Sequence, residues 1–160
     1  MQLVRDFSVL YYLIWKNEHM SERLYPEKPM VGVGAVIFKN DEVLLIKRGN
    51  PPLAGEWSIP GGKLEENESI IEAVKREIKE ECNVLVDIDD LIDMFEYIEK
   101  DEENRVKYHF IVFDFKAQYL KGKLNHLSDA SAARWVKLND IDKYKMKKDA
   151  KNMIMKALNM

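Results

Sequence analysis

The chain has 160 residues, of which 46% are hydrophobic and 33% are charged, and its formal net charge is −3. This length and composition predict one globular domain with its own core and exclude an intrinsically disordered chain. The slight acidity argues against a broad nucleic-acid surface, because such a surface needs excess cations facing the phosphates. One cysteine, Cys82, and three scattered histidines provide neither an internal disulfide nor a Cys–His zinc site. We therefore expect a cytoplasmic protein.

The N-terminal segment predicts a short amphipathic helix rather than a membrane anchor. Its longest apolar stretch, residues 7–15, is far shorter than the about 20 residues that cross a bilayer. The polar residues that follow do not form a signal-peptide cleavage site, and no membrane partner is expected. The apolar positions with helical spacing are Phe7, Leu10, Tyr11 and Ile14.

We expect residues 1–28 to form this helix and a linker, and residues 29–160 to form the main domain. The apolar face of the helix either covers its own domain or forms a homodimer interface. In the second case Phe7, Tyr11 and Trp15 would line the interface. Met20 is an alternative native start, which the sequence leaves open.

A hairpin, a loop and a helix follow in chain order. Alternating residues predict strands at 31–38 and 43–48, joined by a polar turn. The stretch from Gly49 to Gly62 holds three prolines and four glycines, which is typical of a loop. From Ser69 the period becomes helical, and the predicted buried stripe is Ile71, Val74, Ile78 and Cys82.

The second half of the chain is rich in β structure and ends in helices. Short strands are predicted at 84–87 and 94–99, a long strand at 106–119 and a last strand at 133–138. Asn139 or Asp140 is expected to cap a short helix, and the tail from Lys147 has one apolar helical face. Strands on both sides of a central helix predict layered packing of the α/β (α+β) class.

Three glutamates of the central helix form the most informative cluster. Glu77, Glu80 and Glu81 occupy one arc that borders the apolar stripe, and like charges at this spacing repel one another. A hard cation such as Mg²⁺ relieves the repulsion, since it binds carboxylates and substrate phosphates together. The preceding Pro60-Gly61-Gly62 allows close backbone approach to a ligand. The alternative is a solvated helix with ordinary Glu–Lys pairs.

The segment from Gly62 to Val84 resembles the Nudix box, G-x5-E-x7-R-E-U-x-E-E-x-G-U, in which U is aliphatic. The matching residues are Gly62, Glu68, Arg76, Glu77, Ile78, Glu80, Glu81 and Val84. Asn83 replaces the second glycine, and Asn is well suited to a left-handed helix end. Stretches between Tyr25 and Tyr144 are similar to the ADP-ribose pyrophosphatase-like branch of this family.

The resemblance implies a Nudix fold, an α/β/α sandwich with a mixed β-sheet. It also implies metal-dependent hydrolysis of the pyrophosphate bond of a nucleoside diphosphate derivative, with ADP-ribose as the first candidate. Arg76 would orient the box through a salt bridge, with Glu68 as its structural or metal-linked partner. The implied ligands of Mg²⁺ or Mn²⁺ are Glu77, Glu80, Glu81 and Gly61.

Substrate contacts are expected near the second strand and the loop. Lys47 and Arg48 could reach the phosphates, or be ordinary edge cations. Trp57 either packs in the core or stacks on a base. The general base is left open between Asp129 and a box glutamate.

The substrate is also open, because the Pro or Tyr marker of some Nudix branches is absent after the box. Nucleoside triphosphates and dinucleoside polyphosphates could replace ADP-ribose as substrate. The same fold could also serve a non-catalytic nucleotide-sugar sensor or an isomerase with a catalytic cysteine. Cys82 lies on the apolar stripe, which argues against the isomerase.

Overall fold

The computed structural model describes residues 23–50, 53–126 and 130–160. The described residues fall into two compact units, residues 23–30 with Glu96–Ile111 and Val31–Phe95 with Val112–Met160. The candidate site lies in the second unit. The expected helix with Phe7, Tyr11 and Trp15 falls outside the described residues. Within those residues, no helix has the length and apolarity needed to cross a membrane.

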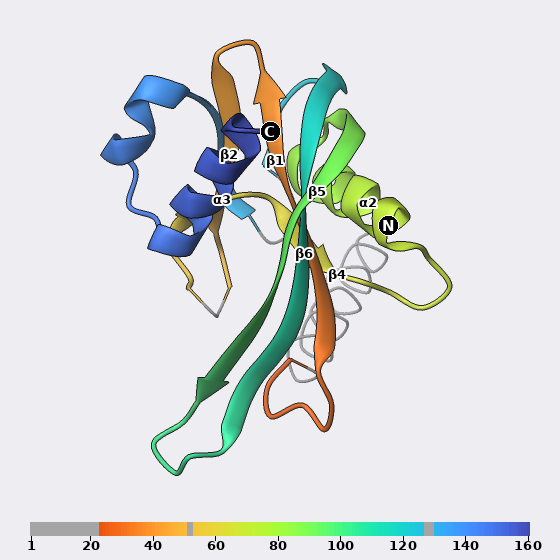
Figure 1. Cartoon of the computed structure of the whole chain (residues 1–160), viewed down its shortest axis with the longest axis vertical. Coiled ribbons are helices and arrows are strands. Elements are labelled where there is room, and N and C mark those ends of the chain that lie inside the picture. The colour runs from red at the N-terminus through yellow and green to blue at the C-terminus, as the bar shows by residue number, and fades with distance from the viewer. Residues whose placement is uncertain (1–22, 51–52, 127–129) are drawn as a thin grey trace, which may run out of the picture. The chain divides into compact units, whose positions relative to one another are not determined.

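Seven strands and three helices make up the described structure (Figure 1). In chain order they are β1 (Met30–Lys39), β2 (Glu42–Arg48), β3 (Trp57–Ser58), β4 (Gly61–Lys63), α2 (Ile70–Cys82), β5 (Leu85–Lys100), β6 (Val106–Lys121), β7 (Ala130–Lys137), the 3₁₀ helix η1 (Leu138–Lys143) and α3 (Lys148–Leu158). The strand order in the sheet is β3-β2-β1-β6-β5, while β4 also pairs with β1 and β7 with β2.

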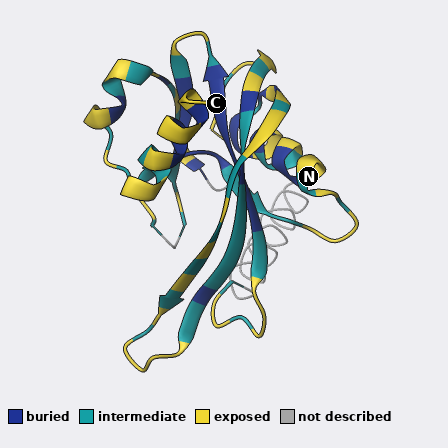
Figure 2. Ribbon diagram, in the orientation of Figure 1, coloured by how far each residue is buried: buried dark blue, intermediate teal, exposed yellow. Residues whose placement is uncertain are grey.

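Alternating residues of β1 and β2 bury both faces of the sheet. Val33, Ala35 and Ile37 pack with α2 in one core cluster, which also contains Leu44 and Ile46 of β2. Val36, Phe38, Val43 and Leu45 pack on the other side with Met153, Ile154 and Ala157 of α3. Since successive strand residues point to opposite faces, α2 and α3 cover opposite faces of the sheet (Figures 1 and 2). This confirms the predicted α/β/α sandwich.

A full capping box fixes the start of α2. The Ser69 side chain accepts from Glu72 N, and the Glu72 carboxylate accepts from Ser69 N at 2.7 Å. At the other end, Asn83 has φ 58° and ψ 30°, the left-handed conformation expected for it. The helix therefore begins and ends where local sequence signals place it.

The buried face of α2 differs from the predicted stripe. Ile71 is 38% exposed, whereas Ala73 is buried with Val74, Ile78 and Cys82. The buried arc is therefore rotated away from Ile71, and Glu81 lies inside it rather than at its border.

The loop predicted from Gly49 to Gly62 contains two short strands. β3 pairs with β2, and β4 pairs with β1 in the register Gly32↔Lys63, Val33↔Gly62 and Gly34↔Gly61. The glycines and prolines of this segment predicted a loop and not β4. The strand forms because it pairs with β1, where Gly34 lies opposite Gly61.

Three other boundaries were predicted wrongly. One continuous strand, β5 (Leu85–Lys100), replaces the two strands predicted at 84–87 and 94–99, because an edge strand with an exposed face accommodates acidic residues. β7 already includes Ala130–Ala132, ahead of the start predicted at residue 133. The helix η1 follows Lys137 with no side-chain cap, so neither Asn139 nor Asp140 has the predicted capping role.

Candidate active site

The box carboxylates are held at different depths along α2. Glu81 is 5% exposed, and its Oε2 accepts from Gly61 N at 3.0 Å. Glu77 Oε1 accepts from Lys63 N at 3.2 Å. The Glu80 side chain is 52% exposed. Two of the three carboxylates thus bind the backbone of β4, which fixes the helix against the glycine strand.

Arg76 joins the carboxylates into one network. Its Nε and Nη2 donate to the two oxygens of Glu68 at 2.9 and 2.7 Å. Nη2 also donates to Lys63 O at 2.9 Å. Nη1 donates to Glu77 Oε1 at 3.0 Å and to Glu80 Oε2 at 3.3 Å. The bidentate Glu68 pair fixes the guanidinium plane, and the remaining donors orient the two glutamates.

Both glycines of β4 are required by close contacts. A Cβ at Gly62 would overlap the Glu77 carboxylate, and a Cβ at Gly61 would overlap the carbonyl of Val33. Gly62 therefore leaves room for the Glu77 carboxylate, whereas Gly61 allows the β1–β4 backbones to approach.

The network and its burial shift the pKa values of its members in opposite directions. The hydrogen bond from Arg76 lowers the pKa of Glu68, and the same bond raises the pKa of Arg76. Burial raises the pKa of Glu77, although Arg76 opposes the shift. Burial also raises the pKa of Cys82, so this thiol is a core group and an unsuitable nucleophile.

The donors near β4 fit a hard divalent cation in chemical type. They are carboxylate oxygens of Glu77, Glu80 and Glu81, and Mg²⁺ and Mn²⁺ favour oxygen ligands. Glu77 and Glu80 contact the same Arg76 nitrogen, so their carboxylates are neighbours. In residues 23–50, 53–126 and 130–160, no three acidic, His or Cys side chains are arranged as a complete metal cluster. Because Arg76 donates to one oxygen of Glu77 and one of Glu80, a cation bound by these two glutamates would lie next to the guanidinium group.

The predicted substrate residues lie at the end of β2. Lys47 and Trp57 are direct Cα partners between β2 and β3. Strand alternation places Lys47 on the α3 face with Leu45, and Arg48 on the α2 face with Ile46. The β2–β7 register shifts between Lys47 and Arg48, as is common near functional sites.

Trp57 packs against the α3-side core. Its ring meets Tyr144 edge to face at a centroid distance of 5.0 Å, and the Arg134 guanidinium lies 5.5 Å from the ring centroid. These contacts favour the packing interpretation over base stacking. Asp129, the candidate base, falls outside the described residues.

Sequence reasoning missed two features of this unit. The Ser69–Glu72 capping box has a recognisable S-x-x-E signature, which could have been found. Asp114 of β6 is 5% exposed. Its only sequence signal is a single acidic residue within a β-rich run, and nothing in that pattern indicates burial.

Comparisons with known proteins agree with this geometry. The model of the NUDIX domain matches residues 28–157. An ADP-ribose pyrophosphatase of Methanocaldococcus jannaschii is 34% identical over 131 residues, which is 82% of this chain and 75% of the relative. The Nudix hydrolase YvcI of Bacillus subtilis is 32% identical over 111 residues, 69% of this chain and 68% of the relative.

A solved MutT Nudix hydrolase from Burkholderia pseudomallei has a similar fold. Its TM-score is 0.70 at 28% identity, over 81% of this chain and 98% of that protein. The family match spans most of the chain and includes the whole Arg76–glutamate network. The chain therefore belongs to the Nudix family and is a Nudix diphosphohydrolase.

Proposed function

We propose that this protein hydrolyses ADP-ribose to AMP and ribose 5-phosphate, with Mg²⁺ or Mn²⁺ as cofactor. The observation that carries the proposal is the network in which Arg76 holds Glu77 and Glu80 beside the β4 backbone that binds Glu81. The relative from M. jannaschii, named as an ADP-ribose pyrophosphatase, supports the substrate.

Glu77, Glu80 and Glu81, with the Gly61 carbonyl, would hold the cation. When bound, the cation supplies charge neutralisation for the diphosphate and lowers the pKa of water. Water then attacks one phosphorus, the bridging P–O bond breaks, and each product leaves with a phosphate group. A box glutamate or Asp129 would accept the proton of the attacking water.

The surrounding residues would position the substrate. Arg76 keeps the carboxylates oriented through its bond to Glu68, so that the ligands need little reorganisation. Arg48, on the same face of the sheet as the box glutamates, would contact the phosphates from the end of β2, whereas Lys47 lies on the α3 face. Trp57 supports this end of the sheet through Tyr144.

The test is product analysis with Mg²⁺ and with Mn²⁺ on a panel of substrates. The panel contains ADP-ribose, nucleoside triphosphates, an oxidised guanine triphosphate and diadenosine polyphosphates. AMP and ribose 5-phosphate formed from ADP-ribose would support the proposal. Preference for a triphosphate or a dinucleoside polyphosphate would keep the diphosphohydrolase and reject the substrate.

Variants of the box glutamates test whether their carboxylates bind the metal, as distinct from a general loss of structure. We expect Glu80→Gln and Glu81→Gln to lose Mn²⁺ binding and most of the rate, while their folds persist. Glu66→Gln is the matched control, because Glu66 lies in the exposed loop before α2. Binding of ADP-ribose without turnover by the wild-type protein would indicate a sensor instead.

A further inference from the structure

Glu65 brings a further carboxylate to the Arg76 network from outside the box residues. It lies in the loop between β4 and α2, and its Oε1 is 3.8 Å from Arg76 Nη1. The Glu65 side chain is 48% exposed, whereas the side chains of Glu68 and Glu77 are 15% exposed. The motif specifies no residue type at this position, so the box pattern gives Glu65 no role.

A turn ties the backbone of Glu65 to the same network. Glu65 N donates to Glu68 Oε1 at 2.8 Å, and both oxygens of Glu68 accept from Arg76. Within this turn Asn67 has the left-handed conformation, with φ 62°. The bond to Glu68 thus keeps residue 65, and with it the Glu65 carboxylate, close to Arg76.

Glu65 contacts Arg76 through charge rather than through a hydrogen bond. A guanidinium group has five N–H donors, and the five hydrogen bonds of Arg76 go to Glu68, Glu77, Glu80 and the Lys63 carbonyl. The separation of 3.8 Å exceeds hydrogen-bond length. Glu65 therefore stands beside Nη1, the nitrogen that donates to Glu77 and Glu80, as an additional acceptor.

Metal binding would weaken the bonds of this nitrogen. Glu77 and Glu80 accept from Nη1, and both are proposed ligands of the cation. Carboxylates that hold a divalent cation attract a guanidinium less, and the two positive groups repel each other. An N–H released in this way needs a new acceptor, because the Arg76 side chain is only 22% exposed.

We propose that Glu65 is a positioning residue for the metal site and acts through Arg76. Its carboxylate accepts the N–H of Nη1 that Glu77 or Glu80 releases on binding the cation. Arg76 thereby keeps its orientation in the metal-bound protein. This inference rests on the proposed metal-dependent hydrolysis and deepens it, because it assigns part of the metal affinity to a residue outside the box.

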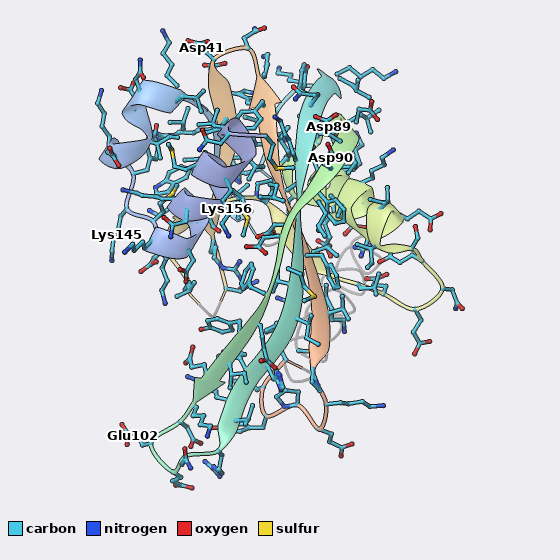
Figure 3. All side chains as sticks on the ribbon, in the orientation of Figure 1. Asp41, Asp89, Asp90, Glu102, Lys145 and Lys156 are labelled. Carbon is cyan, nitrogen blue, oxygen red and sulfur yellow. The ribbon has the colours of Figure 1, made fainter. Side chains whose placement is uncertain are left out.

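Calorimetric titration with Mn²⁺, in the absence of nucleotide, tests the proposal. The proteins are the wild type, Glu65→Gln, and two controls that also lose one exposed negative charge. The controls are Glu66→Gln in the same loop and Asp90→Asn on β5, which Figure 3 labels.

We expect Glu65→Gln to weaken Mn²⁺ binding about ten-fold, as is typical when an outer partner of metal ligands is removed. The two controls should change the affinity less than about three-fold at physiological salt, because exposed charges are screened there. All variants should unfold at the wild-type temperature without metal, which separates the effect from general damage.

A double-mutant cycle with Arg76→Lys tests whether Glu65 acts through the guanidinium group. Lysine has no planar fork and cannot bond Glu68 while it also donates to Glu65. We therefore expect Glu65→Gln to weaken Mn²⁺ binding much less in the Arg76→Lys protein than in the wild type.

Two outcomes overturn the inference while the wild type binds Mn²⁺. One is an effect of Glu65→Gln no larger than that of Glu66→Gln, and the other is an equal effect with Arg76 and with Lys at this position. Absence of Mn²⁺ binding by the wild type would refute both the inference and the proposed cofactor. If Mn²⁺ binding depends on Glu65 but ADP-ribose is not hydrolysed, the substrate proposal fails and the inference stands.

Discussion

Replacement of Arg76 tests whether one guanidinium organises the box. Its side chain is 22% exposed and donates five hydrogen bonds, two of them to Glu68. Arg76→Ala would leave Glu68 and Glu77, each with a side chain 15% exposed, without this cation. Breaking a buried ion pair costs about 3–5 kcal/mol. Because the group is partly solvated, we expect about 3 kcal/mol of lost unfolding free energy.

Arg76→Lys separates charge from geometry. An ammonium keeps the charge but cannot form the bidentate Glu68 pair and reach Glu77 in one plane. We expect a loss of about 1–2 kcal/mol, from the missing charge-assisted bonds. We also expect a larger fall in kcat than the loss of stability would account for, because Glu77 and Glu80 lose their orientation.

Urea unfolding and steady-state kinetics measure the two effects. Arg105→Ala is the matched control, because Arg105 forms a surface pair with Asp101 and its side chain is 59% exposed. Such pairs contribute up to about 1 kcal/mol. If Arg76→Ala destabilised the protein no more than Arg105→Ala, or Arg76→Lys kept full activity, the organising role would be refuted.

Three further predictions follow from particular contacts. Gly62→Ala should lower activity strongly while the protein stays folded, because the new Cβ would meet the Glu77 carboxylate. Gly61→Ala should instead lower the unfolding temperature, because its Cβ would meet the backbone of β1. Ser69→Ala should cost about 1 kcal/mol in urea unfolding through loss of the capping box. Asp114 binds a proton more tightly in the folded state, since its pKa rises from 3.8 to about 7. Wild-type stability relative to Asp114→Asn should therefore fall between about pH 4 and 7, by at most about 4 kcal/mol. No pH-dependent difference would disprove this.

Local signals in the sequence predicted the elements that depend on neighbouring residues. The β1–β2 hairpin has alternating apolar residues and a polar turn, and α2 has a clear helical period. Asn83 was expected to adopt the left-handed conformation, and it does so at φ 58°. These features require no knowledge of distant contacts.

Features that depend on distant partners could not be predicted in the same way. β4 forms because Gly61 and Gly62 pair with β1, which itself contains glycine. The sequence of residues 61–63 alone does not indicate this pairing. β5 continues through acidic residues because it is an edge strand, and only the topology shows this. Periodicity also assigned Ile71 to the core and left out Ala73, because the prediction gave more weight to the more hydrophobic side chain.

Glu81 shows why the site differs most from its sequence pattern. Periodicity places a carboxylate beside the apolar stripe, but cannot tell that it will be buried within it. The helix tolerates Glu81 at 5% exposure because Gly61 N donates to it from β4. That bond also ties α2 to β1 through the Gly34–Gly61 pairing. The same glycine pair adjoins Asp114 on the opposite face, so a side chain at Gly34 should displace the Asp114 carboxyl group.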